Sequence, residues 1–83
     1  MKKLTIAVDF DGTLCKFAFP EIGEQTEDQI ELTNKLIDMR YLGHKLILWT
    51  CRGDLNDLLY LTDAIKWCRS RGLEFDAINS NLE

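Results

Sequence analysis

Two aspartates that follow a strongly apolar run are the residues of this sequence whose types and spacing best suit chemistry. Asp9 and Asp11 lie two positions apart in the segment VDFDGTL, residues 8–14. Because side chains alternate along an extended chain, residues at i and i+2 project to the same side. In open parallel sheets, ligands bind at the carboxyl ends of the strands. If residues 4–8 form such a strand, both carboxylates stand at a ligand-binding edge.

A divalent cation would explain why two carboxylates are placed together, since they otherwise repel each other and any phosphate. Oxygen ligands and an anionic substrate suit Mg²⁺. Gly12 lets the backbone turn sharply, and its amide can approach a phosphoryl oxygen. The structural alternative is an Asx-type turn, in which Asp9 and Asp11 only cap the strand end. The complete D-x-D-G-T string after an apolar strand favours the functional interpretation.

Three apolar segments are expected to form the strands of one parallel sheet. Residues 4–8 (LTIAV) and 45–49 (KLILW) read as strands buried on both faces, and residues 74–78 read as a third strand. Residues 15–23 are expected to form a loop over the strand ends, and this loop contains Phe17 and Phe19.

Two helices are expected between these strands. The first begins at the capping box Thr26-Glu27-Asp28-Gln29 and ends at Gly43, with an apolar face formed by Ile30, Leu36, Ile37 and Tyr41. The second begins near Asp54 as its N-cap and ends at Gly72, with Leu58, Leu61, Ile65 and Cys68 along one face. The β-α-β-α-β order suits right-handed crossovers. We therefore predict a single α/β domain over residues 1–83, Rossmann-like and three-layered (α/β/α), truncated to about three strands.

Composition excludes several classes of protein. Ten Lys and Arg against fourteen Asp and Glu give a net charge of −4, which argues against charge-driven binding of nucleic acid. No apolar run is long enough to span a membrane. The three cysteines, an odd number without C-x-x-C spacing, argue against a secreted disulfide scaffold. We expect a cytoplasmic protein with reduced thiols, of which Cys51 lies beside the candidate site.

Two segments resemble motifs of a known family. DFDGT (residues 9–13) resembles motif I of the haloacid dehalogenase-like (HAD) phosphohydrolases, and LILWT (residues 46–50) resembles their motif II. The resemblance covers essentially the whole chain and is closest to the small capless HAD proteins of bacteria and phages. It implies an Mg²⁺-dependent phosphatase that acts on a small phosphorylated molecule.

The resemblance also implies a role for each residue. Asp9 would attack phosphorus and form an aspartyl-phosphate, while Asp11 would act as acid and then as base. Mg²⁺ would be bound by Asp9 and Asp11, through the carboxylate of the first and the backbone carbonyl of the second. Thr50 would bind a phosphoryl oxygen together with the amides of Asp11 and Gly12. Arg52 follows on the same rim and is expected either to bind phosphate through two hydrogen bonds or to be a solvated residue before a helix.

The family's motif III Lys or Arg and its motif IV acids are missing from this sequence. In the family they accompany two further strands beside the first one. Without these strands, residues 4–8 are expected to form an exposed edge, in either a fragment or a short form that pairs with a second copy. Two alternatives to a phosphatase therefore stand: an inactive HAD-like module that binds a partner, and a phosphate-accepting receiver-type regulator. The D-x-D-G-T string argues against the receiver, which has no need of Asp11.

Overall fold

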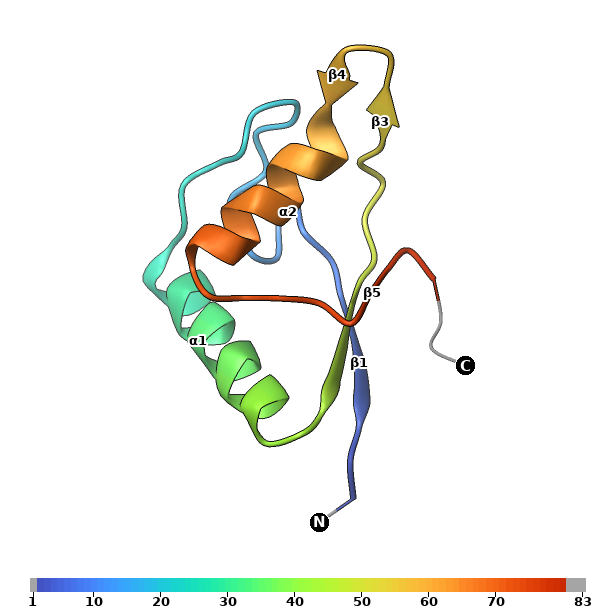
Figure 1. The fold of residues 1–83 in the computed structure, drawn as a ribbon. Coiled ribbons are helices and arrows are strands. Elements are labelled where there is room, and N and C mark those ends of the chain that lie inside the picture. Colours follow the sequence, from blue (N-terminus) through green and yellow to red (C-terminus); the bar gives the residue numbers. More distant parts are fainter. Residues whose placement is uncertain (1, 81–83) are drawn as a thin grey trace.

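Three short parallel strands form the sheet, and two helices pack against it (Figure 1). The structure is a computed structural model that describes residues 2–80. Its elements are β1 (Thr5–Val8), α1 (Glu27–Tyr41), β2 (Lys45–Leu48), β3 (Asp54–Leu55), β4 (Leu58–Leu59), α2 (Tyr60–Ser70) and β5 (Ala77–Ile78). The order across the sheet is β1-β2-β5, and both pairings are parallel. The predicted α/β class is thus confirmed.

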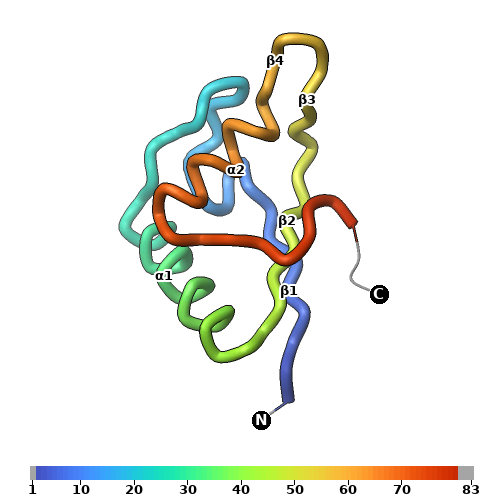
Figure 2. The backbone as a smooth tube through the Cα atoms, in the orientation of Figure 1, coloured from blue at the N-terminus to red at the C-terminus, as the bar shows by residue number. Residues whose placement is uncertain are grey.

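The helices cover one face of the sheet, so residues 2–80 form two layers rather than the predicted three. α1 and α2 lie on the same side of the strands (Figures 1 and 2), and both contribute to one core with the same face of β1 and β2. On β1, Val8 is buried and Ile6 packs against this core, whereas Thr5 and Ala7 are exposed. The prediction that β1 is buried on both faces was therefore wrong. On β2, by contrast, the consecutive residues Leu46, Ile47 and Leu48 are all buried, as predicted for that strand.

β1 lies at an edge of the sheet, as predicted for residues 4–8. Leu4, just before the strand, is 48% exposed. Pairing of this edge with a second copy stays a prediction. No helix within residues 2–80 has the length and apolar character needed to cross a bilayer.

The capping box predicted for α1 is present. The Thr26 hydroxyl accepts a hydrogen bond from the Gln29 amide (3.2 Å), and the Gln29 side chain accepts one from the Thr26 amide (2.9 Å). Leu36 is buried, but Ile30 is 45% and Tyr41 91% exposed, contrary to prediction. The buried residues of the helix are Thr33 and Leu36. At 3.6 residues per turn, Ile30 and Tyr41 lie on a different side of the helix from Leu36, so they do not face the core.

The second helix begins later than predicted. Residues 54–59 form an antiparallel hairpin, β3–β4, whose turn contains Asn56 at a φ of 56°, and α2 begins at Tyr60. Asp54 nevertheless caps this helix from the hairpin, since its Oδ1 accepts hydrogen bonds from the amides of Leu61 and Thr62 (3.0 Å each). The Thr62 hydroxyl also donates to this carboxylate and, with the Thr62 amide, lowers the pKa of Asp54. Asp54 therefore caps the second helix as predicted, but it does so from the preceding hairpin and not from the N-cap position.

The third strand is shorter than the predicted residues 74–78, because β5 comprises only Ala77 and Ile78. Before it, Asp76 bonds to Leu46 of β2 in two ways. The Asp76 amide donates to the Leu46 carbonyl (2.8 Å), and the Asp76 carboxylate accepts from the Leu46 amide (2.9 Å). The Asp76 carboxylate takes the place of a backbone carbonyl as the acceptor for the Leu46 amide. Regular strand pairing therefore begins at the next residue, Ala77.

Candidate active site

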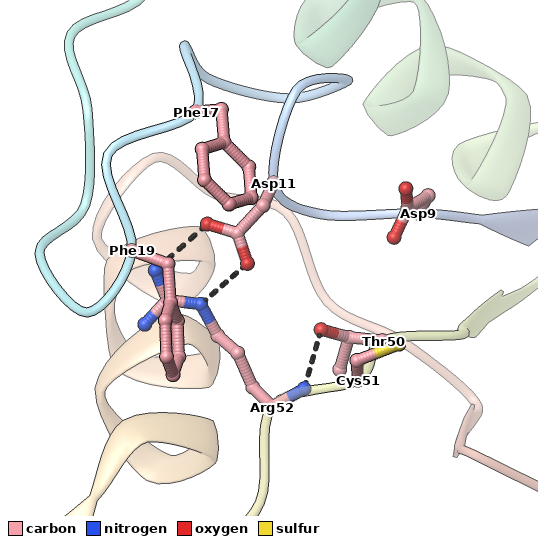
Figure 3. Close-up of a pocket in the computed structure, with 7 residues that line it drawn as sticks. All are labelled: Asp9, Asp11, Phe17, Phe19, Thr50, Cys51 and Arg52. Carbon is pink, nitrogen blue, oxygen red and sulfur yellow. Dashed lines mark hydrogen bonds and ion pairs between the residues drawn. The ribbon is translucent and has the colours of Figure 1, made fainter.

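The predicted site residues come together where β1 and β2 end. Val8 pairs with Leu48 in parallel register, and the Trp49 amide donates to the Val8 carbonyl (2.9 Å). The residues that follow these strands, Asp9 and Thr50, therefore lie at the same edge of the sheet. A pocket of about 300 Å³ opens there (Figure 3), lined by Asp9, Asp11, Phe17, Phe19, Thr50, Cys51 and Arg52.

Asp9 presents a carboxylate with most of its hydrogen-bonding capacity unused. The residue is exposed, and its Oδ1 accepts a bond from the Phe10 amide (2.8 Å), the one bond this carboxylate makes within residues 2–80. In Figure 3 it stands apart from the other carboxylate of the pocket. An ionised carboxylate with free lone pairs can act as a nucleophile or as a ligand for a cation.

Asp11 is fully engaged by Arg52. The guanidinium donates through Nε to Asp11 Oδ2 and through Nη2 to Asp11 Oδ1, both at 2.8 Å (Figure 3). The side chain of Arg52 is 1% exposed, and that of Asp11 is 14% exposed. The hydrogen bond with Asp11 is the main reason that the pKa of Arg52 is raised above its usual value. Two parallel charge-assisted hydrogen bonds fix the position of this carboxylate.

Arg52 has no donors left over for a phosphate in this conformation. Beyond Asp11, it donates to the carbonyls of Pro20 (3.2 Å), Glu21 (2.9 Å) and Tyr60 (3.4 Å). The residue is 3% exposed, so the prediction of a solvated residue was wrong. Arg52, predicted to bind phosphate, instead lies in the loop after β2 and forms hydrogen bonds with two other parts of the chain. These are the loop after β1 and the start of α2.

Aromatic rings surround this guanidinium. Its Cζ lies 5.0 Å from the ring centroids of both Phe10 and Phe19, within range of cation–π attraction. Phe19 also makes an edge contact with Tyr60, with ring centroids 5.1 Å apart. The sequence had indicated a loop over the strand ends. It did not indicate that Phe17 and Phe19 of this loop would form a wall of the pocket.

Thr50 is held at the rim of the pocket by hydrogen bonds with Asn79 and Arg52. Its amide donates to Asn79 Oδ1 (2.8 Å), and its hydroxyl accepts from the Arg52 amide (3.1 Å). Asn79 is itself anchored, since its amide donates to the Leu48 carbonyl (2.7 Å). Within the described chain the Thr50 hydroxyl donates no hydrogen bond, so its proton is available to an acceptor in the pocket.

Gly12 does not offer its amide to the pocket, contrary to prediction. The amide donates to the Cys15 carbonyl (2.9 Å), which closes a tight turn after Asp11. Glycine suits this position because its φ is +83°, a conformation that other residues rarely adopt. A side chain here would meet nothing within 4 Å, so backbone conformation rather than space favours glycine.

The donor set fits an Mg²⁺ ion that is held mainly by water and phosphate. Residues 2–80 contain no group of three His, Cys, Asp or Glu side chains that could hold a metal. The Asp9 carboxylate has one oxygen without a hydrogen bond, and the Asp11 carbonyl accepts none of the backbone hydrogen bonds of the described loop. Mg²⁺ often uses one or two protein oxygens and keeps several waters. The Asp11 carboxylate is not a suitable ligand while Arg52 binds both of its oxygens.

Comparisons with known proteins give a structural relative. No protein-family model and no curated protein matches the chain. A solved structure of a conserved protein from Bacteroides thetaiotaomicron is 46% identical, with a TM-score of 0.77. The match covers 95% of this chain and 60% of that chain, so this chain spans little more than half of its relative. The two proteins share the fold over this region.

Proposed function

We propose that the protein is an Mg²⁺-dependent phosphatase of the HAD type that acts through Asp9 on a small phosphorylated molecule. The observation that carries this proposal is that two groups lie at one pocket: the Asp9 carboxylate, which accepts a single hydrogen bond, and the Thr50 hydroxyl, whose proton is free. Both lie at the carboxyl ends of adjacent parallel strands, the usual ligand site in open α/β sheets. The D-x-D-G-T string at this position supports the same reaction.

In this proposal the residues act in two steps. An Asp9 oxygen forms a bond to phosphorus while the bond from phosphorus to the leaving oxygen breaks, which gives an aspartyl-phosphate. Water then attacks this phosphorus, releases inorganic phosphate and restores the Asp9 carboxylate. In both steps the Thr50 hydroxyl donates a hydrogen bond to a phosphoryl oxygen. Bound Mg²⁺ would neutralise charge on the phosphoryl group, with Asp9 and the Asp11 carbonyl as its protein ligands.

The role of Asp11 depends on its pairing with Arg52. While the Arg52 guanidinium bonds to both Asp11 oxygens, a substrate has to compete with it for contact with this carboxylate. Asp11 therefore acts as acid or base only in a conformation in which Arg52 has released it. In the conformation described here, the pair is a neutral, rigid part of the pocket wall.

Phosphate release tests the proposal. We expect release of inorganic phosphate from an aryl phosphate in the presence of Mg²⁺, and its loss when EDTA removes the metal. Asp9→Asn should lower the rate by at least about a thousandfold, because the nucleophile is gone. Asp38→Asn, on the exposed face of α1, is the matched control and should keep the wild-type rate. Equal rates for Asp9→Asn and wild type would exclude Asp9 as the nucleophile.

A non-catalytic module that binds a partner is the second candidate. The Arg52–Asp11 pair favours it, since the residue proposed as acid and base is bound within the protein. In that case, correctly folded protein releases no phosphate with or without Mg²⁺.

A further inference from the structure

One end of the pocket is aromatic and strongly exposed. Phe17 is 73% and Phe19 44% exposed, and both line the pocket that contains Asp9 and Thr50. In Figure 3 the two rings lie at the end of the pocket opposite Asp9. A ligand with its phosphate at Asp9 and Thr50 therefore extends toward two phenyl rings.

Phe19, one of the two rings at the aromatic end, is held in place before any ligand arrives. Phe19 packs on the Arg52 guanidinium and against Tyr60. Arg52 also binds the carbonyls of the next two residues, Pro20 and Glu21. A ring fixed in this way loses little conformational entropy when a ligand packs on it, so its contact area contributes efficiently to binding.

Toward the two rings, the described side chains that line the pocket offer few free polar groups to recognise the edge of a nucleobase. Between the two ends lies the Asp11–Arg52 pair, whose hydrogen-bonding groups are engaged with each other and with backbone carbonyls. The volume of about 300 Å³ is at the lower end for small-molecule sites. These properties suit one flat apolar ring.

The state of Asp11 favours the same kind of substrate for a chemical reason. The Arg52 guanidinium occupies both oxygens of Asp11, so a leaving group that departs without contact to this carboxylate suits the pocket. A phenol is such a leaving group, because its pKa of about 10 lies far below that of an aliphatic alcohol and the phenolate therefore departs more readily than an alkoxide.

From these observations we infer that the pocket selects phosphate monoesters of single-ring phenols, with the ring against Phe17 and Phe19. This inference rests on the proposed function for turnover, but not for ligand binding. In the first step an Asp9 oxygen bonds to phosphorus, and the bond from phosphorus to the phenolic oxygen breaks. The electron pair leaves with the phenolate, which takes a proton from water, and hydrolysis of the aspartyl-phosphate restores Asp9.

Binding of phosphonates tests ring selection without turnover, since their carbon–phosphorus bond resists hydrolysis. With Mg²⁺ present, calorimetry should show phenylphosphonate binding about fivefold to tenfold more tightly than methylphosphonate. Phe17→Leu should remove most of this preference, whereas Phe17→Tyr, which keeps the ring, should preserve it. Equal affinity of the two phosphonates for wild-type protein, or an unchanged preference in Phe17→Leu, would overturn the inference. Failure of both to bind would overturn it as well.

Turnover separates this inference from the proposed function. Wild-type protein should hydrolyse phenyl phosphate with a kcat/KM at least about a hundredfold above that for glycerol phosphate, because of the better leaving group. Equal values would overturn the selection by leaving group. If phenylphosphonate is preferred but no phosphate is released from any ester, the proposed phosphatase function fails and the aromatic binding site stands.

Discussion

Arg52 and Asp11, 41 positions apart in the sequence, are joined by two parallel hydrogen bonds of 2.8 Å. Their ion pair connects the loop after β1 to the loop after β2. Through Arg52 it also holds the carbonyls of Glu21 and Tyr60. The geometry of the pocket therefore depends on one buried guanidinium, and this dependence can be measured.

Loss of the guanidinium should destabilise the fold. Arg52→Met leaves Asp11 and three carbonyls without their donor, and we expect the free energy of unfolding to fall by about 3 kcal/mol in urea denaturation. Arg52→Lys keeps the charge but cannot form two parallel hydrogen bonds with Asp11, so the free energy of unfolding should fall by an intermediate amount. Arg69→Met is the control: its pair with Glu74 is long (3.8 Å) and exposed, and should contribute less than about 0.5 kcal/mol. Similar losses for Arg52→Met and Arg69→Met would contradict the assigned role of Arg52.

The Thr50 hydroxyl should contribute to phosphate binding. Thr50→Val removes a donor to a charged ligand and should weaken binding of phenylphosphonate by about tenfold, whereas Thr50→Ser should bind like wild type. Thr50→Val also leaves the Arg52 amide without its acceptor, so a loss of about 1 kcal/mol in unfolding free energy is expected. Thr5→Val, on the exposed face of β1, should change neither quantity. Unchanged phosphonate affinity in Thr50→Val would exclude contact with the ligand.

Asp76 should make stability depend on pH. Burial raises the pKa of this carboxyl, but hydrogen bonds from the Leu46 amide and Arg40 outweigh burial, so the pKa lies below its usual value. Because the folded pKa is the lower one, the contribution of Asp76 is complete above its unfolded pKa of about 3.9 and is lost as pH falls through the folded value. Asp76→Asn should therefore cost about 1–2 kcal/mol at pH 7 and less at pH 3.

Urea denaturation of wild type and Asp76→Asn at both pH values checks this prediction. Asp38→Asn, at an exposed position of α1, should stay within about 0.5 kcal/mol of wild type at pH 7. A difference between wild type and Asp76→Asn that grows as the pH falls would show that the sign of the linkage is wrong.

Cys51 should be the reactive thiol of the folded protein. It is exposed at the pocket, whereas Cys15 and Cys68 are buried. Burial raises the pKa of Cys15, and it raises the pKa of Cys68 to about 12, so neither is ionised near neutral pH. Mass spectrometry after brief treatment with iodoacetamide at pH 8 should find one adduct, at Cys51, and three adducts after unfolding. Cys51→Ser should show none in the folded state.

Alkylation of Cys51 should also block the pocket. The added group fills space beside Thr50, so phenylphosphonate binding should be lost in the alkylated protein and retained in Cys51→Ser. Full binding by the alkylated protein would place Cys51 outside the path of the ligand.

Local patterns were enough to predict the main elements of the fold. The apolar run before Asp9, the run before Thr50 and the capping box at Thr26 each depend on residues close together in sequence. Parallel pairing of two such strands brings their carboxyl ends to one edge, so the proximity of Asp9 and Thr50 followed from the order of elements. The start of α2 did not follow, because Asp54 can cap a helix from a preceding hairpin as well as from its own N-cap position.

The sequence by itself determined the α/β class, the strands that carry Asp9 and Thr50, and the presence of carboxylates at a strand end. Only the tertiary structure decided which carboxylate is free. Asp9 keeps unused lone pairs, while Asp11 is bound by an arginine that local patterns had assigned to phosphate or to solvent. The physical reason is that a strand or a helix turn forms from neighbouring residues. The partner of a long charged side chain depends instead on which donors and acceptors the fold brings within 3 Å of it.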